Sequence, residues 1–128
     1  MTENEIIKTK RVLILEYDPL AASLFKAIFE DYGYDVQIVN TMAKCLEKAI
    51  LFNPSLIIMR YLFEGGTADR LVATMREMPY LKDKPILVYT NTLLGGEEEK
   101  LEKAGTRYFL TDTNGIKLLK KTNEILKM

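Results

Sequence analysis

Short apolar runs alternate with helical patterns five times along this chain, and this alternation constrains its fold more than any other sequence feature. Three runs are continuous, at residues 12–15 (VLIL), 56–59 (LIIM) and 86–89 (ILVY). A fourth run alternates apolar and polar residues over 35–40, and a short fifth run spans 108–110. Apolar residues three and four apart follow the runs, a spacing typical of amphipathic helices. Strands that alternate with helices predict a parallel sheet with helices on both faces.

The character of each run predicts its place in the sheet. Continuous apolar runs suit the buried interior, whereas the alternating second run and the short fifth run suit the edges. A strand order of 2-1-3-4-5 meets both demands with right-handed crossovers. The expected fold class is therefore α/β, a doubly wound (βα)5 three-layer sandwich of flavodoxin-like order. We expect this domain over residues 11–128 and a flexible, polar segment over residues 1–10.

Composition excludes several classes of function. The chain has no His, which excludes His-based acid–base catalysis and the common His-containing zinc sites. Its 18 Lys and Arg balance 18 Asp and Glu, so net charge draws it neither to nucleic acid nor to a membrane. The single Cys45 cannot form an internal disulfide and lies on an apolar helical stripe, which indicates a core position. With no apolar run long enough to span a bilayer, we expect a cytoplasmic protein.

Polar side chains gather where a ligand would bind in such a fold. In open α/β sheets, ligands bind beyond the carboxyl ends of the strands, where the strand order reverses. Asp18 precedes Pro19 at the start of a helical pattern, so a helix-capping role is favoured for it over a ligand role. The residues that follow the four relevant strands are Glu16, Tyr17, Asp18, Arg60, Thr90, Asn91, Thr111 and Asp112.

From about Arg11 onward the chain resembles the receiver domains of bacterial two-component response regulators. The resemblance rests on the segments VLILEYDP, GYDV, NPSLIIMR, KDKPILVYTN and AGTRYFLT, taken in order and at their spacing. Such receivers have an acidic pair that holds Mg²⁺, an Asp that accepts a phosphoryl group, a Ser or Thr, and a Lys-Pro pair. Their fifth strand also contains an aromatic switch residue.

The resemblance assigns a degenerate phosphorylation pocket to this chain, because only the hydroxyl position keeps its usual residue. Arg60 occupies the phosphoacceptor position, and a guanidinium is a permanent cation with no nucleophilic oxygen. The other matching positions are Glu16 and Tyr17 for the acidic pair, Thr90 for the hydroxyl, Asp112-Thr113 for Lys-Pro, and Phe109 for the switch aromatic.

Two positions of the pocket carry a charge of the opposite sign to that in the family pattern. Arg60 replaces an acid, and Asp112 replaces the lysine. A fixed cation beside the metal position repels Mg²⁺, and Tyr17 removes one oxygen ligand, so we expect weak or absent Mg²⁺ binding and no other cofactor. We hypothesise that Arg60 bridges Glu16 and Asp112 and so replaces the metal and the phosphate with an internal ion pair.

The resemblance implies a non-enzymatic pseudo-receiver that works in signal transduction by contact with a protein partner. In the family, the effect of phosphorylation is read out on the face formed by the fourth helix, the fifth strand and the fifth helix, and for this chain we expect a protein partner or a homodimer through the same face. The Lys117, Lys120 and Lys121 run on the last helix indicates a solvated face. The candidate contact residues are Leu93, Leu94, Leu101, Arg107, Phe109 and Lys117.

Two other functions stay open from the sequence. One is a conventional phosphorelay receiver with a displaced acceptor, for which Asp18 and Asp112 are the nearest carboxylates. The other is a sensor of a small anion drawn to Arg60 and Thr90. Thr90 could also serve only to satisfy backbone groups at the strand end.

Overall fold

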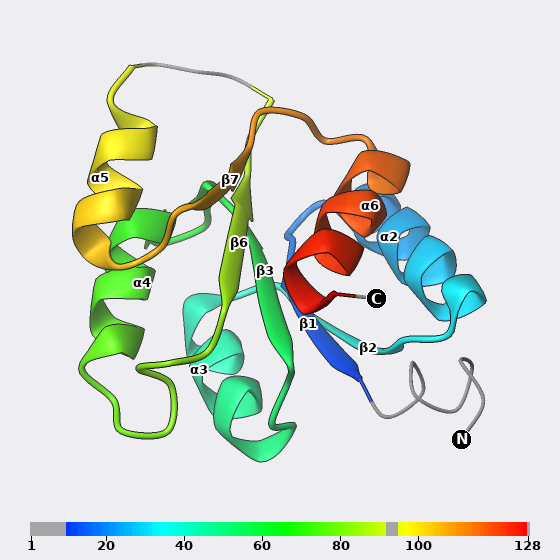
Figure 1. Ribbon diagram of the computed structural model, residues 1–128, viewed down its shortest axis with the longest axis horizontal. Coiled ribbons are helices and arrows are strands. Elements are labelled where there is room, and N and C mark those ends of the chain that lie inside the picture. The colour runs from blue at the N-terminus through cyan, green and yellow to red at the C-terminus, as the bar shows by residue number, and fades with distance from the viewer. Residues whose placement is uncertain (1–9, 92–94, 128) are drawn as a thin grey trace.

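A computed structural model describes residues 10–91 and 95–127 of the chain. Its main sheet is parallel with the order β2-β1-β3-β6-β7, which is the predicted order 2-1-3-4-5 (Figure 1). The predicted fold class is thereby confirmed. The five strands are β1 (Arg11–Leu15), β2 (Asp35–Val39), β3 (Leu56–Arg60), β6 (Ile86–Tyr89) and β7 (Tyr108–Leu110).

Helices cover both faces of this sheet and make the molecule three layers thick. Helices α2 and α6 pack on one face, and α3, α4 and α5 pack on the other (Figure 1). Within the described ranges, no helix is both long enough and apolar enough to cross a membrane. The helices are α2 (Pro19–Tyr32), α3 (Met42–Leu51), α4 (Ala68–Arg76), α5 (Glu97–Ala104) and α6 (Gly115–Leu126).

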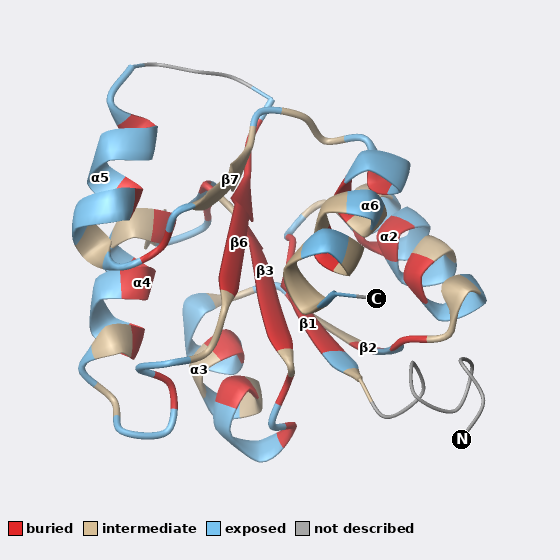
Figure 2. Cartoon of the chain, in the orientation of Figure 1, coloured by how far each residue is buried: buried red, intermediate tan, exposed pale blue. Residues whose placement is uncertain are grey.

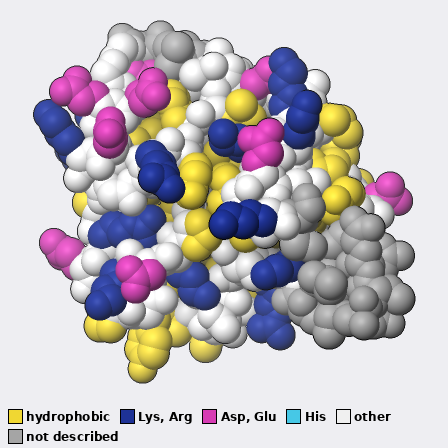
Figure 3. All heavy atoms as spheres, viewed as in Figure 1, with side chains coloured by type: hydrophobic (Ala, Val, Ile, Leu, Met, Phe, Trp, Pro, Cys, Tyr) yellow, Lys and Arg dark blue, Asp and Glu magenta, His cyan; other side chains and the backbone are white. Residues whose placement is uncertain are grey.

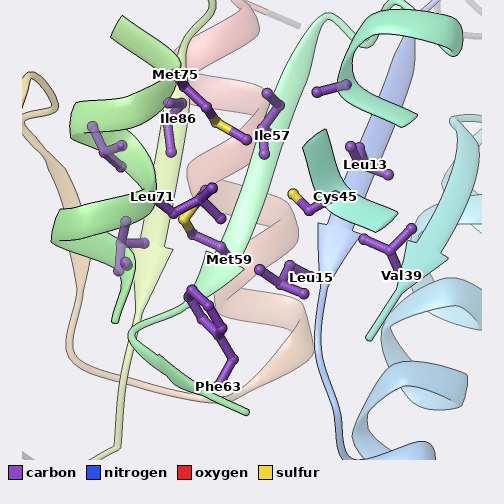
Figure 4. Packing of buried hydrophobic residues seen from close by; sticks show 14 of the residues in the cluster. Leu13, Leu15, Val39, Cys45, Ile57, Met59, Phe63, Leu71, Met75 and Ile86 are labelled. Carbon is purple, nitrogen blue, oxygen red and sulfur yellow. The ribbon is translucent and has the colours of Figure 1, made fainter. Parts of the chain in front are cut away.

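Side chains that alternate along the central strands supply one core on each face. Leu13 and Leu15 point to the face covered by α3, α4 and α5, whereas Val12 and Ile14 point to the face covered by α2 and α6. Burial follows this arrangement, since the central strands are buried along most of their length (Figure 2). Cys45 lies in the first of these cores with Leu15 and Met59 (Figure 4), and burial raises the pKa of its thiol to about 12.

Local sequence determines where the helices begin. The Asp18 carboxylate accepts a hydrogen bond from the Leu20 N–H at 3.2 Å, directly before Pro19 opens α2. This contact confirms that Asp18 is a helix cap, and it turns the carboxylate toward the helix backbone. Asn114 caps α6 in the same way, by accepting from the backbone N–H groups of Ile116 and Lys117.

A small hairpin interrupts the connection from β3 to α4. Strands β4 (Leu62–Phe63) and β5 (Gly66–Thr67) pair antiparallel around a turn at Glu64 and Gly65. Gly65 has a φ of 94°, a conformation that most other residues adopt only with strain. The hairpin follows directly after Arg60 and Tyr61, so it lies beside the predicted pocket.

Candidate functional site

Three side chains from three neighbouring strands meet at the carboxyl edge of the sheet. Glu16 follows β1, Arg60 ends β3, and Tyr89 ends β6. In a parallel sheet these ends lie along one edge, and β1, β3 and β6 are direct neighbours. The sequence predicted that Glu16 and Arg60 share a crevice, and the structure brings them together.

The Glu16 carboxylate is the centre of this group, and its side chain is fully buried. Its Oε1 accepts from Arg60 Nη1 at 3.0 Å and from the Tyr89 hydroxyl at 2.7 Å. Its Oε2 accepts from the backbone N–H of Asp18 at 3.1 Å. A buried charge is tolerated when it is paired and hydrogen-bonded, and both oxygens of Glu16 meet this condition.

Arg60 supplies the positive charge that balances Glu16. Its side chain is 19% exposed, and its guanidinium lies 5.3 Å from the centre of the Tyr17 ring. Burial alone would lower the pKa of Arg60, but the charge and hydrogen bond of Glu16 outweigh burial, and the pKa is raised. Arg60 therefore stays a cation, held between a carboxylate and an aromatic face.

Tyr89 is a pocket residue that the sequence analysis missed. It is fully buried, its ring meets Phe25 edge-on at 5.6 Å, and its hydroxyl donates to Glu16. Burial, followed by the Glu16 charge, raises the pKa of its phenol, so the hydroxyl stays protonated. The available signal was a hydroxyl-bearing residue at the end of an otherwise aliphatic strand, directly before Thr90.

Asp112 does not join the predicted bridge, and that part of the hypothesis is wrong. Its carboxylate pairs with Lys117 Nζ at 2.8 Å and accepts from the Asn114 N–H at 2.9 Å. The hydrogen bond from Lys117 is the main cause that lowers the pKa of Asp112. Asp112 lies three residues before α6 begins, so it turns toward the first turn of that helix. Among the described residues, the internal ion pair of the pocket is Arg60–Glu16.

The remaining pocket residues lie around this pair. Tyr17 is 46% exposed and covers the guanidinium of Arg60 from the solvent side. Thr90 is buried, and its backbone N–H donates to the Leu110 carbonyl at 3.1 Å, which ties β6 to β7. No group of three or more Cys, Asp or Glu side chains suited to a metal ion occurs in the described part of the chain.

Only some of the predicted contact residues are exposed to solvent. Leu101 is 1% exposed and packs in the core beneath α5, so its assignment as a contact residue is wrong. Phe109 is half-buried against the same core, whereas Arg107 and Lys117 are exposed. Leu93 and Leu94 lie outside the described residues. Acidic side chains gather over α5 and basic ones over α6 on the two sides of β7 (Figure 3).

Sequence comparison finds response regulators. No family model matches the chain. The polar-differentiation response regulator DivK of Brucella ovis is 23% identical over 103 residues, which cover 80% of this chain and 84% of that protein. DivK of Brucella anthropi is 22% identical over 102 residues, which cover 80% of this chain and 83% of the relative.

Structure comparison finds the same class of protein. A response regulator of unestablished role from Chloroflexus aurantiacus superposes with a TM-score of 0.82 at 21% identity, covering 93% of this chain and 98% of that one. The chemotaxis response regulator CheY4 of Vibrio cholerae gives a TM-score of 0.82 at 20% identity and covers 91% and 98% of the two chains. These likenesses establish the fold.

Proposed function

We propose that this chain, which is a relative of the response-regulator receiver domains and shares their fold, is a signalling domain that does not depend on phosphorylation. The observation that supports the proposal is the ion pair between Arg60 and the buried Glu16. Arg60 ends β3, where the resemblance expects the phosphoacceptor. A guanidinium cannot form an acyl phosphate, and here it already neutralises the nearest acid.

The residues of the pocket do not fit the Mg²⁺ ion that the resemblance implies. Mg²⁺ needs a near-octahedral set of oxygen ligands. Both oxygens of Glu16 are engaged by Arg60, Tyr89 and the Asp18 backbone, and the Asp18 carboxylate caps α2. We infer that a divalent ion would have to displace a guanidinium from a buried carboxylate, which opposes binding.

A conventional phosphorelay receiver would need another carboxylate, Asp18 or Asp112, as its phosphoacceptor. The contacts of these two carboxylates favour the phosphorylation-independent function instead. Asp18 accepts from the Leu20 backbone, and Asp112 is paired with Lys117. Neither of them follows β3. For an anion sensor at Arg60, the Glu16 charge is unfavourable, because it cancels the charge that would attract the ligand.

We further propose that the domain acts through the face formed by α5, β7 and α6. Acidic Glu98 and Glu99 lie on α5, basic Lys120 and Lys121 lie on α6, and these two helices flank β7 (Figure 1). A two-fold axis through this face would set the acids of one copy against the bases of the other. The half-buried Phe109 lies between them, so a homodimer is the simplest protein partner that this pattern fits.

Acetyl phosphate with Mg²⁺, followed by intact mass measurement, tests the phosphorylation-independent function. We expect no phosphoryl adduct on the wild-type chain. The matched comparison is the triple variant Arg60→Asp, Tyr17→Asp, Asp112→Lys, which restores the family pattern and is expected to gain the adduct. A phosphoryl adduct on the wild-type chain would contradict the proposal.

Charge reversal tests the proposed homodimer. Sedimentation equilibrium is expected to show dimers for the wild type and monomers for Lys120→Glu/Lys121→Glu and for Glu98→Lys/Glu99→Lys. A mixture of the two charge-reversed variants should associate, because each then matches the other. A wild type that is monomeric at high protein concentration would exclude the homodimer and leave a different protein as the partner.

A further inference from the structure

A second charged hollow lies at the amino ends of β6 and β7, at the opposite end of the sheet from the Glu16–Arg60 pair. It has a volume of about 450 Å³ and is open to solvent. The residues that line it are Arg76, Lys82, Asp83, Lys84, Pro85, Glu102, Gly105, Thr106, Arg107 and Tyr108.

Arg76 is fixed in place by backbone carbonyls and not by a carboxylate. Its Nη1 donates to the carbonyls of Leu81 at 2.9 Å and Lys84 at 2.8 Å, and its Nε donates to the Gly105 carbonyl at 2.9 Å. These contacts engage the Nε and Nη1 donors of Arg76, and none of their acceptors carries a charge that would neutralise the guanidinium. Burial lowers the pKa of Arg76, and Asp83 opposes this only in part.

Lys84 is held in the same manner. Its Nζ donates to the side-chain amide oxygen of Asn53 at 2.6 Å, which is a neutral acceptor. Burial lowers the pKa of Lys84. Two partly buried cations thus line one hollow, both oriented by neutral oxygens.

The other charges of the hollow do not cancel them. Lys82 and Arg107 are exposed, and the Arg107 guanidinium lies over the Tyr108 ring at 5.5 Å. Across residues 10–91 and 95–127, none of the four cations is within ion-pair distance of a carboxylate. Against four cations stand two carboxylates, Asp83 and Glu102, so the lining has a net charge of +2.

We propose that this hollow binds a soluble small molecule that bears a phosphate group. Cations that are fixed, partly desolvated and not neutralised favour a multiply charged oxyanion, since charge-assisted hydrogen bonds to such groups are the strong ones. The volume accommodates a ligand of about nucleotide size. The proposal does not rest on the function proposed for the Glu16–Arg60 pocket, because the two sites share no residue.

Titration of the full-length chain with inorganic pyrophosphate tests this site, by calorimetry in a phosphate-free buffer and by amide NMR shifts. We expect saturable binding, with the largest shifts at residues 82–85 and 105–108. Arg107→Gln removes one exposed cation and should weaken binding roughly tenfold. Asp83→Asn removes a repelling carboxylate and should strengthen binding severalfold.

Lys26→Gln is the matched control, because it removes the same charge from the exposed face of α2, outside both the hollow and the proposed dimer face. We expect it to change the affinity less than about twofold. Equal weakening by Lys26→Gln and Arg107→Gln would overturn the proposal, since it would indicate attraction by net charge only. Failure to saturate, or NMR shifts centred on Arg60 and Thr90, would also overturn it.

Vesicles that contain phosphatidic acid distinguish a soluble ligand from a lipid headgroup. Flotation of the chain with these vesicles, together with no calorimetric response to pyrophosphate, would exclude the soluble ligand. Binding to pyrophosphate without flotation is the expected result.

Discussion

Arg60 and Arg76 are partly buried arginines at opposite ends of the sheet, and they differ in what they contact. Arg60 meets the buried carboxylate of Glu16 at 3.0 Å. Arg76 meets carbonyl oxygens of the α4–β6 connection and of Gly105. The pKa of Arg60 is raised, whereas that of Arg76 is lowered.

The difference shows that hydrogen bonding and charge neutralisation are separate requirements. A carboxylate meets both requirements, so the positive charge at the Arg60 end of the sheet is neutralised within the protein. Carbonyl groups meet only the first, so the Arg76 end keeps a positive charge that a ligand can use. Substitutions at the two ends should therefore lower the free energy of unfolding by different amounts, and different second substitutions should restore it.

The largest effect is expected for Arg60→Met. The substitution keeps much of the side-chain volume but leaves the Glu16 carboxylate buried without a countercharge. Breaking such a pair from one side typically costs 3–5 kcal/mol, so we expect a loss of about 3 kcal/mol in the free energy of unfolding, measured by urea denaturation.

The partner variant Glu16→Gln is the control for this interpretation. Arg60 is 19% exposed and can turn toward water, so the loss of Glu16 should cost less than the loss of Arg60. The double variant should recover part of the stability lost in Arg60→Met. If Arg60→Met and the double variant were equally unstable, the uncompensated charge would not be the cause.

Arg76→Met is expected to cost less, about 2 kcal/mol. Its four carbonyl partners lose a donor, but the contacts to Gly105 and Lys82 are exposed, so these two carbonyls can bind water instead. Amide hydrogen exchange should accelerate in residues 77–85 and leave β1 and β3 protected. A loss of protection in all strands would show that Arg76 supports the whole fold and not this connection.

Tyr89→Phe isolates the hydroxyl contribution to the Arg60 end. The ring contact with Phe25 is kept, and only the hydrogen bond to Glu16 is lost. A hydrogen bond to a charged group contributes about 1.5 kcal/mol or more. We therefore expect a loss of that order in the free energy of unfolding, seen as a lower melting temperature. An unchanged melting temperature would indicate that water replaces the hydroxyl.

Asp112→Asn should have the smallest effect. The lowered pKa of Asp112 means that its contribution to stability is present above the usual Asp pKa and is lost as the pH falls through the folded-state value. Because the pair with Lys117 is exposed, we expect no measurable change in the free energy of unfolding at pH 7. At acidic pH, the free energy of unfolding of Asp112→Asn should fall slightly less steeply with pH than that of the wild type. A clear loss of stability at pH 7 would instead place Asp112 in the pocket network.

Much of the fold was predictable because burial patterns and capping are local signals. The continuous apolar runs determined which strands are central, and the Asp18-Pro19 pair determined the start of α2. The β4–β5 hairpin was missed, because two-residue strands have no periodicity to detect. Leu101 was misassigned, because an apolar residue on a short acidic helix can face either the core or a partner.

The pocket was predictable only in part, because residue identity does not determine the direction of a side chain. The resemblance indicated that Arg60 replaces an acid, and the predicted pairing of Arg60 with Glu16 is found in the structure. The sequence also suggested Asp112, which the geometry assigns to Lys117, and it omitted Tyr89. Asp112 pairs with a lysine only five residues further along the chain, whereas the partner of Tyr89 lies 73 residues away in the sequence.

The sequence by itself determined the parallel sheet, its strand order and the presence of a cation at the end of β3, since each follows from the type and spacing of residues. Only the tertiary structure decided that Glu16 is saturated by Arg60 and Tyr89, and that Arg76 and Lys84 are bound by neutral oxygens. The physical reason is that neutralisation depends on which charges are within a few ångströms in space, and residues 16, 60 and 89 meet only after the sheet has formed.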